Sequence, residues 1–191
     1  MVLPLCAPPW YASMLANRVW TTPKAMAIAD HTQVGENLSL RAMTPADRDF
    51  LRALYRSLRE EELARLPAEW VEPFLDQQFD AQMHHYTTYY DTSRYAIVES
   101  GGRPIGRLFV DRWPSEIRVV DIGLLPEFRG QGIATILFGQ LFDEADRDGL
   151  MVSIHVERNN PAKRLYERLG FIAREVGNEV YLLMERAAPK P

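Results

Sequence analysis

The sequence contains little cysteine, no excess of basic residues and no long apolar run, and each shortage excludes a class of protein. Its single cysteine, Cys6, cannot form an internal disulfide, and its four histidines have no cysteine partners for a structural zinc site. The net charge of -4 is unsuited to neutralising the phosphates of a nucleic acid. We therefore expect a cytoplasmic protein without a metal that binds neither DNA nor RNA.

The apolar stretches are also too short for a bilayer. No window approaches the roughly 20 consecutive apolar residues of a membrane helix. The first ten residues lack Lys and Arg and contain three prolines, which is not typical of a signal peptide. We therefore expect neither membrane attachment nor export.

Length and composition indicate one folded domain with an appendage. Hydrophobic residues make up 47% of the 191 residues and charged residues 25%, which is enough apolar material for a core. Residues 1–36 show no sustained period and predict an N-terminal extension that packs on the body through Trp10, Tyr11 and Trp20. The domain itself is expected at residues 37–188, as a monomer or a homodimer.

Hydrophobic periodicity predicts a mixed α/β domain. Alternation at residues 38–41 predicts a strand, and residues 44–47, with the sequence Thr-Pro-Ala-Asp, carry the hydroxyl, proline and carboxylate of a helix start. Further strands are expected at residues 95–98, 105–110, 117–125, 151–156, 171–174 and 180–184, and helices at 50–58, 69–86, 132–148 and 161–169. Because a helix separates strands 117–125 and 151–156, we expect them to be parallel.

A loop with two glycines joins the buried strand at 117–125 to the amphipathic helix. Gly130 and Gly132 let the backbone turn sharply, and the free N–H groups of the helix start attract an anion. Thr135 stands where a dinucleotide fingerprint has its third glycine, and no Gly-Lys-Ser/Thr completes a Walker loop. The loop is therefore interpreted as an anion cradle, the alternative being a loop that only turns the chain.

Two segments together resemble the GCN5-related N-acetyltransferase (GNAT) superfamily. Residues 129–134, Arg-Gly-Gln-Gly-Ile-Ala, are similar to its pyrophosphate-binding signature Gln/Arg-x-x-Gly-x-Gly/Ala. Residues 159–171, Asn-Asn-Pro-Ala-Lys-Arg-Leu-Tyr-Glu-Arg-Leu-Gly-Phe, resemble its second conserved segment. The clear resemblance covers about residues 116–172.

The resemblance implies a splayed mixed sheet flanked by helices, which binds acetyl-CoA in the gap between two parallel strands. It implies direct transfer of the acetyl group to a primary amine of a small molecule or a protein, in a ternary complex. The alternative is a catalytically idle acyl-CoA sensor or structural subunit. The implied cofactor-binding residues are Gly123, Leu124, Leu125, Arg129, Gly130, Gln131, Gly132, Ile133, Ala134, Thr135, Asn159, Asn160, Ala162 and Tyr166.

Two side chains are the main candidates for proton transfer. By resemblance, Tyr166 is the acid that protonates the leaving thiolate, whereas from its helical spacing it is a core tyrosine. Asp121 lies in an apolar strand, where an ionised carboxylate is costly unless it is hydrogen bonded or functional, and it is our first candidate for the base. A structural aspartate is the alternative. The other candidate bases are Glu116, His155, Glu157 and water.

Three other features keep two interpretations each. The family asparagine aligns with Asn159 or Asn160, and Asn160 before a proline is also a good helix cap. The adjacent His84 and His85 lack the spacing of two helical metal ligands, so we expect them to line a substrate pocket rather than hold a metal. Residues 59–62, Arg-Glu-Glu-Glu, form either a solvated helix face or an acidic rim that favours a cationic amine.

Overall fold

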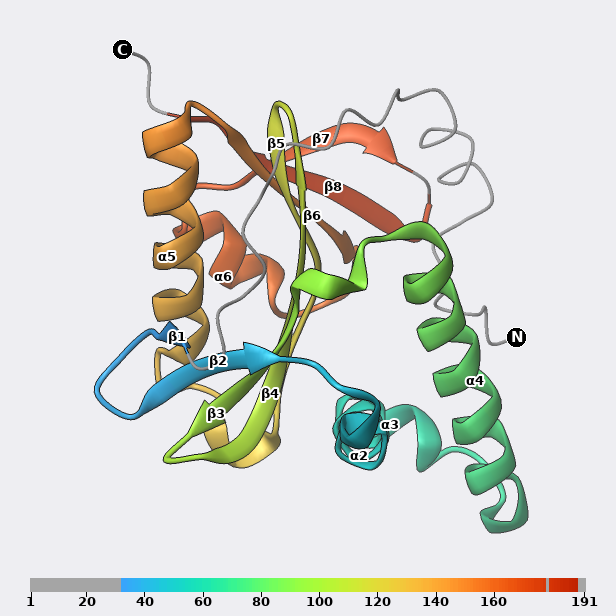
Figure 1. Ribbon diagram of the computed structural model, residues 1–191. Coiled ribbons are helices and arrows are strands. Elements are labelled where there is room, and N and C mark those ends of the chain that lie inside the picture. The colour runs from blue at the N-terminus through green and yellow to red at the C-terminus, as the bar shows by residue number, and fades with distance from the viewer. Residues whose placement is uncertain (1–31, 178, 189–191) are drawn as a thin grey trace.

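An eight-stranded mixed sheet forms the centre of the molecule (Figure 1). The structure, a computed structural model, describes residues 32–177 and 179–188. In the order β1-β2-β3-β4-β5-β6-β8-β7, all neighbouring strands are antiparallel except β5 and β6. The strands are β1 (Thr32–Gln33), β2 (Leu38–Ala42), β3 (Tyr95–Ser100), β4 (Arg103–Trp113), β5 (Glu116–Leu124), β6 (Met151–Glu157), β7 (Ile172–Gly177) and β8 (Tyr181–Arg186).

Helices cover both faces of this sheet, with α5 and α6 on one face and α2 and α4 on the other (Figure 1). The α-helices are α2 (Arg48–Leu58), α3 (Glu60–Leu63), α4 (Ala68–Tyr89), α5 (Ile133–Asp148) and α6 (Lys163–Arg168). Short 3-10 turns are η1 (Pro45–Asp47), η2 (Thr92–Arg94) and η3 (Pro126–Phe128). None of the helices in the described part of the chain is long and apolar enough to cross a membrane.

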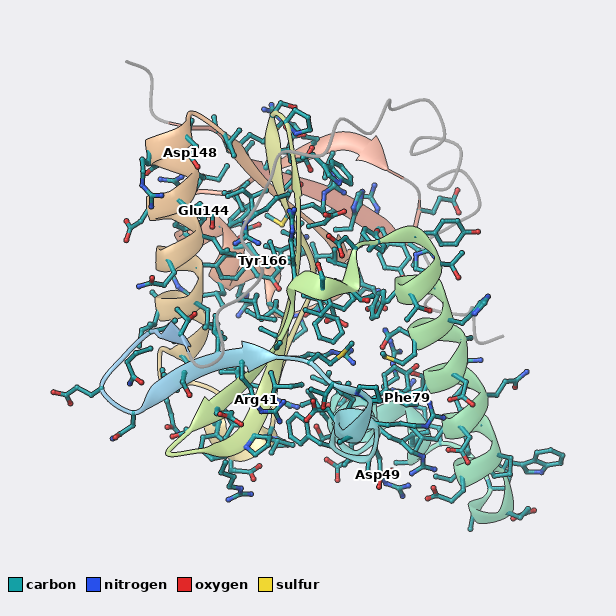
Figure 2. All side chains as sticks on the ribbon, in the orientation of Figure 1. Arg41, Asp49, Phe79, Glu144, Asp148 and Tyr166 are labelled. Atoms are coloured by element: carbon teal, nitrogen blue, oxygen red, sulfur yellow. The ribbon has the colours of Figure 1, made fainter. Side chains whose placement is uncertain are left out.

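Two separate apolar cores lie on the two faces of the sheet because side chains alternate along each strand. On β4, Leu108 and Val110 join the core under α5 and α6, whereas Phe109 between them joins the core under α2 and α4. Figure 2 shows Phe79 of α4 pointing toward α2, where its ring lies 5.9 Å from that of Tyr55. The second core therefore fastens α4 to the sheet and to α2.

The predicted fold class and the parallel pairing of strands 117–125 and 151–156 are confirmed. Each expected strand and helix is present, although α4 is longer than expected and contains Pro73. The predicted helix start is also found, because Asp47 Oδ2 accepts hydrogen bonds from the backbone N–H and the hydroxyl of Thr44. Strand β1 and helix α3 were not predicted. Strand β1 lies among the residues assigned to the extension, and it pairs with β2 of the domain. The expected contacts of Trp10, Tyr11 and Trp20 lie outside the described residues.

Candidate active site

Strands β5 and β6 separate halfway along their length. Their parallel pairing runs from Glu116 opposite Met151 to Val119 opposite Ile154 and then stops. Strand β5 continues to Leu124 and β6 to Glu157, so the carboxyl ends of the two strands diverge. The predicted gap between two parallel strands is therefore present.

A cavity of about 290 Å³ opens where this pairing ends. Its walls come from strands β4, β5, β6 and β8, from the C-terminal parts of α2 and α4, and from α6. The residues that line it are Tyr55, Leu58, Arg59, Gln82, His85, Tyr86, Tyr90, Arg107, Arg118, Val119, Val120, Asp121, Ile122, Ile154, His155, Val156, Glu157, Asn160, Tyr166 and Tyr181. Both proton-transfer candidates, Asp121 and Tyr166, are among them.

A bulge in β5 positions Asp121 at the cavity. The β4–β5 register shifts so that Phe109 pairs with Asp121 while Val110 pairs with Val119, which leaves Val120 without a partner. The Asp121 side chain is 16% exposed. An extra residue in one strand changes the direction of the neighbouring side chains. The bulge therefore affects where the Asp121 carboxylate points.

Asp121 is held by two partners on other elements. Arg107 Nη2 on β4 lies 2.5 Å from Asp121 Oδ2, and the Tyr86 hydroxyl on α4 donates to the same oxygen at 2.6 Å. Arg107 also donates to Gln82 Oε1 at 3.1 Å. Among the described residues, both the hydrogen bond and the ion pair of Asp121 fall on Oδ2 and none on Oδ1. The carboxylate thus keeps one oxygen for another group.

Tyr166 of α6 is buried in the core and also lines the cavity. Its ring is buried in the core against Phe138 and Phe171, at 5.6 and 5.9 Å between ring centres. Figure 2 shows the residue near the middle of the molecule, and its side chain also lines the cavity. Burial, with Asp121 nearby, raises the pKa of the Tyr166 hydroxyl above its usual value, so the hydroxyl stays protonated at neutral pH.

Two of the other candidate bases are poorly suited to accept a proton. Glu116 is 4% exposed and is not among the residues that line the cavity, and its Oε1 receives hydrogen bonds from Arg118, at 2.6 Å, and from Ser153. Arg118 also lies 2.7 Å from Nδ1 of His155. Because the guanidinium always donates, this Nδ1 accepts and the neutral ring carries its proton on Nε2. Burial and Arg118 lower the pKa of His155 to about 3, which makes it a weak base.

Glu157 is the last residue of β6, three residues beyond the end of the β5–β6 pairing. Its side chain lines the same cavity and is half-buried. The structure therefore leaves two carboxylates at the cavity wall, Asp121 and Glu157, of which Asp121 has the fixed geometry.

The glycine loop forms an open cradle at the start of α5. Gly130 and Gly132 have φ values of 73° and 79°, a left-handed conformation that disfavours any other residue. Gly132 is the N-cap and has no side chain to bind the first N–H groups of the helix, and a Cβ placed there would meet nothing within 4 Å. The N–H groups of Ile133, Ala134 and Thr135 therefore have no partner within the helix. This backbone arrangement suits a pyrophosphate.

Side chains around the cradle fasten the loop. Arg129 Nε donates to the carbonyl of Leu124 at 2.9 Å, and its Nη2 donates to the carbonyl of Ser57 at 3.3 Å. Gln131 donates to the carbonyl of Glu127 at 2.7 Å. Arg129 thus fastens the loop to the end of β5 and Gln131 fastens it to η3, while backbone N–H groups at the start of α5 stay without a partner in the helix.

The other implied cofactor residues lie along the path from the cradle to the cavity. Gly123 and Leu124 end β5, and the N–H of Leu125 is already bonded to the carbonyl of Ile105. Asn160 lines the cavity, and its Oδ1 accepts a hydrogen bond at 2.9 Å from the N–H of Ala162, the N-cap of α6. Asn160 therefore has the capping contact, while Asn159 is exposed and lies outside the cavity wall.

Sequence reasoning missed the partners of Asp121. Arg107, Gln82 and Tyr86 lie in a different strand and in a helix, and no motif connects them to Asp121. His85 lines the cavity, as expected, whereas His84 does not. Within the described ranges 32–177 and 179–188, no group of three His, Cys, Asp or Glu side chains could hold a metal ion.

Comparison with known proteins gives the relationship of the chain. A family model described as "Acetyltransferase (GNAT) family" matches residues 51–171. A curated relative from Methanocaldococcus jannaschii, named as an uncharacterized N-acetyltransferase, is 32% identical over 96 residues, which are 45% of this chain and 42% of the relative. The chain thus spans less than half the length of that relative.

Solved structures share the fold. The PaiA N-acetyltransferase of Thermoplasma acidophilum, in complex with coenzyme A, has a TM-score of 0.59 and 14% identity over 78% of this chain and 98% of its own. An acetyltransferase of Salmonella typhimurium, described as modifying the N-terminal serine of ribosomal protein L7/L12, has a TM-score of 0.58 and 16% identity, over 84% and 100% of the two chains. Because the family model matches residues 51–171, which are more than half of the chain and include both strands of the gap, the chain belongs to the acetyltransferase (GNAT) family.

Proposed function

We propose that the protein is an N-acetyltransferase that moves the acetyl group of acetyl-CoA directly to a primary amine in a ternary complex. The observation that carries this proposal is the pair formed by Asp121 and Tyr166 at one cavity, where β5 and β6 part. Acetyl-CoA would supply the activated thioester. Family membership and the coenzyme A complex of the Thermoplasma acidophilum structure support the cosubstrate.

The cradle and the gap divide the binding of the cosubstrate between them. The N–H groups at the start of α5 would hold the pyrophosphate, and the diverging ends of β5 and β6 would take the pantetheine arm between them. Residues 123–125 connect these two places, so a ligand bound at the cradle would reach the cavity along the end of β5.

Asp121 and Tyr166 supply the two proton transfers that acetyl transfer to an amine needs. As the amine nitrogen bonds to the acetyl carbon and the carbon–sulfur bond breaks, Asp121 Oδ1 accepts the proton that leaves nitrogen. The hydroxyl of Tyr166 donates a proton to the departing sulfur. The raised pKa of Tyr166 keeps this proton available at neutral pH. Both groups contact reacting atoms in this scheme.

A panel of amines tests the proposal. Acetyl-CoA is incubated with peptides bearing a free N-terminus, lysine, a polyamine and amino acids, and both free thiol and the mass of the product are measured. Peptide N-termini come first because the Salmonella typhimurium protein is described as modifying an N-terminal serine. We expect transfer to at least one amine. Tight binding of acetyl-CoA with no transfer to any amine would favour the sensor instead.

Two isosteric variants identify the base on the accepted amine. Asp121→Asn should lower turnover roughly 100- to 10,000-fold and remove the acidic limb of the rate–pH profile, whereas Glu157→Gln should retain both. Melting temperature and coenzyme A affinity are measured on the same preparations. A folded Asp121→Asn variant with the wild-type profile would assign the base to Glu157 or water.

A further inference from the structure

Four side chains from three elements form a network in the cavity wall, which we call the Asp121 network: Gln82, Tyr86, Arg107 and Asp121. Arg107 is 1% exposed, and its Nη2 contacts both Asp121 Oδ2 and Gln82 Oε1. Gln82 and Tyr86 are four residues apart and so lie on one face of α4. The network therefore connects α4 to β4 and β5 through polar contacts in an otherwise apolar region.

Both contacts to Asp121 fall on the same oxygen. The ion pair with Arg107, at 2.5 Å, already supplies a partner for the carboxylate, and the Tyr86 hydroxyl adds a second donor to Oδ2 at 2.6 Å. Two donors from different directions on Oδ2 fix the rotation of the carboxylate group, and Oδ1 is then the oxygen left for the cavity.

Tyr86 is itself held in place. Its ring makes edge contacts with the stacked rings of Tyr95 and Phe109, at 6.0 and 5.7 Å between centres and interplanar angles of 90° and 89°. Burial, with Asp121 nearby, raises the pKa of the Tyr86 hydroxyl well above its usual value. The hydroxyl thus remains a donor, at a fixed position, over the whole range in which an enzyme is assayed.

We propose that Tyr86 and Arg107 are positioning residues that hold Asp121 with Oδ1 turned toward the attacking amine. This inference rests on the proposed function, in which Asp121 is the base. Neither residue contacts the reacting atoms. The other charged or titratable side chains that line the cavity with Asp121 are Tyr55, Arg59, His85, Tyr90, Arg118, His155, Glu157, Tyr166 and Tyr181. His155 has a pKa of about 3 and stays neutral in the assay range. Besides Asp121, the carboxylate at the cavity wall is that of Glu157.

The Tyr86→Phe variant tests the proposal, because it removes the hydroxyl but keeps the ring packing. We expect turnover to fall roughly 10- to 100-fold, as for loss of a hydrogen bond to a charged group. The acidic limb of the rate–pH profile should move to higher pH by about one unit, because a donor to the ionised carboxylate is lost. The KM for acetyl-CoA should not change. Tyr89→Phe is the matched control, since Tyr89 is 40% exposed on the same helix and outside the cavity wall.

A double-mutant comparison separates positioning from stability. If Tyr86 acts through Asp121, Tyr86→Phe should add no further loss of turnover in an Asp121→Asn background. Arg107→Lys, which keeps the charge, should retain more activity than Arg107→Gln. The inference is overturned if Tyr86→Phe matches Tyr89→Phe in rate and pH profile, or if its loss is fully additive with Asp121→Asn. A wild-type protein that acetylates no amine would instead overturn the proposed function, so the two failures are distinguishable.

Discussion

Asp121 lies in the second half of β5, and the cradle at the start of α5 follows the end of that strand. The cradle and the Asp121 network are built from different kinds of atoms. The cradle presents backbone N–H groups, and its three side-chain contacts, two from Arg129 and one from Gln131, fasten the loop. The network consists of side chains brought together from α4, β4 and β5. In the proposed function the cradle would bind the cosubstrate through backbone atoms, whereas the network would act through side chains, each of which a single substitution can remove.

The two regions also differ in exposure, and exposure determines what disturbs them. Gly130 and Gly132 are exposed at the surface, where solvent would screen the charge of a phosphate bound there. Arg107 is almost completely buried, so removal of its partner would leave a charge without compensation. We therefore expect coenzyme A affinity to tolerate substitutions around the cradle that preserve its backbone. We expect turnover, in contrast, to fall on the loss of a single polar atom from the Asp121 network.

After Asp121→Asn, the largest effect at the cavity is expected from Tyr166→Phe. The variant keeps the ring contacts with Phe138 and Phe171 but removes the proton donor, so turnover should fall roughly 10- to 1,000-fold while the melting temperature and the affinity for coenzyme A stay near wild type. Steady-state kinetics and calorimetry measure these quantities on one preparation. Wild-type turnover would return Tyr166 to a purely structural role in the core.

The cradle was predictable from the sequence because its atoms are consecutive. Gly130 and Gly132 precede an amphipathic helix, and a strand–loop–helix order is enough to predict exposed N–H groups. The fold was predictable for a similar reason, since the alternating and helical periods of residues 38–184 locate nearly every element. The two-residue strand β1 is too short to produce a period, and it was missed.

The Asp121 network was only half visible. A carboxylate in the apolar strand at 117–125 indicated Asp121, and Arg107 in the apolar strand at 105–110 carried the same kind of signal with opposite charge. Pairing the two needed the bulged register, which places Phe109 opposite Asp121 and Gly123 opposite Arg107. Tyr86 lies 35 residues before Asp121 in the sequence and reaches it only through the packing of α4, which no local pattern encodes.

His155 shows how a neighbour changes a residue's chemistry. A histidine at the end of a strand near the gap is a reasonable base when only its type is known. The contact of its Nδ1 with the Arg118 guanidinium, together with burial, lowers its pKa to about 3 and fixes the tautomer. The position of Arg118 across the β5–β6 pair is a tertiary property, so this correction required the structure.

An intermediate effect is expected from Gly132→Glu in the cradle. The new side chain meets no atoms of the protein, but it puts a negative charge where phosphate would bind and strains a backbone with positive φ. Coenzyme A affinity should fall roughly 10- to 100-fold. Gly149→Glu is the matched control, because Gly149 also has positive φ and caps the other end of α5. Equal affinities of the two variants would remove the cradle from the binding site.

The smallest effect concerns the pH dependence of stability on the acceptor side. His155 has a pKa of about 3 in the folded protein and about 6.5 when unfolded, so below pH 6.5 the unfolded chain binds a proton that the folded protein does not. Its contribution to stability is complete above pH 6.5 and is lost progressively as the pH falls toward 3. At neutral pH the histidine is neutral in both states, so its titration does not make stability depend on pH there.

His155→Asn isolates this contribution, because an asparagine oxygen can accept the hydrogen bond from Arg118 without titrating. Denaturant unfolding at pH 7, 5.5 and 4.5 should show a smaller loss of stability with falling pH in the variant than in the wild type. His84→Asn is the control, since His84 is exposed on α4 and should leave the pH dependence unchanged. Parallel curves for the wild type and His155→Asn would show that His155 titrates alike in both states. The contact with Arg118 would then not be what lowers the pKa of His155 in the folded protein.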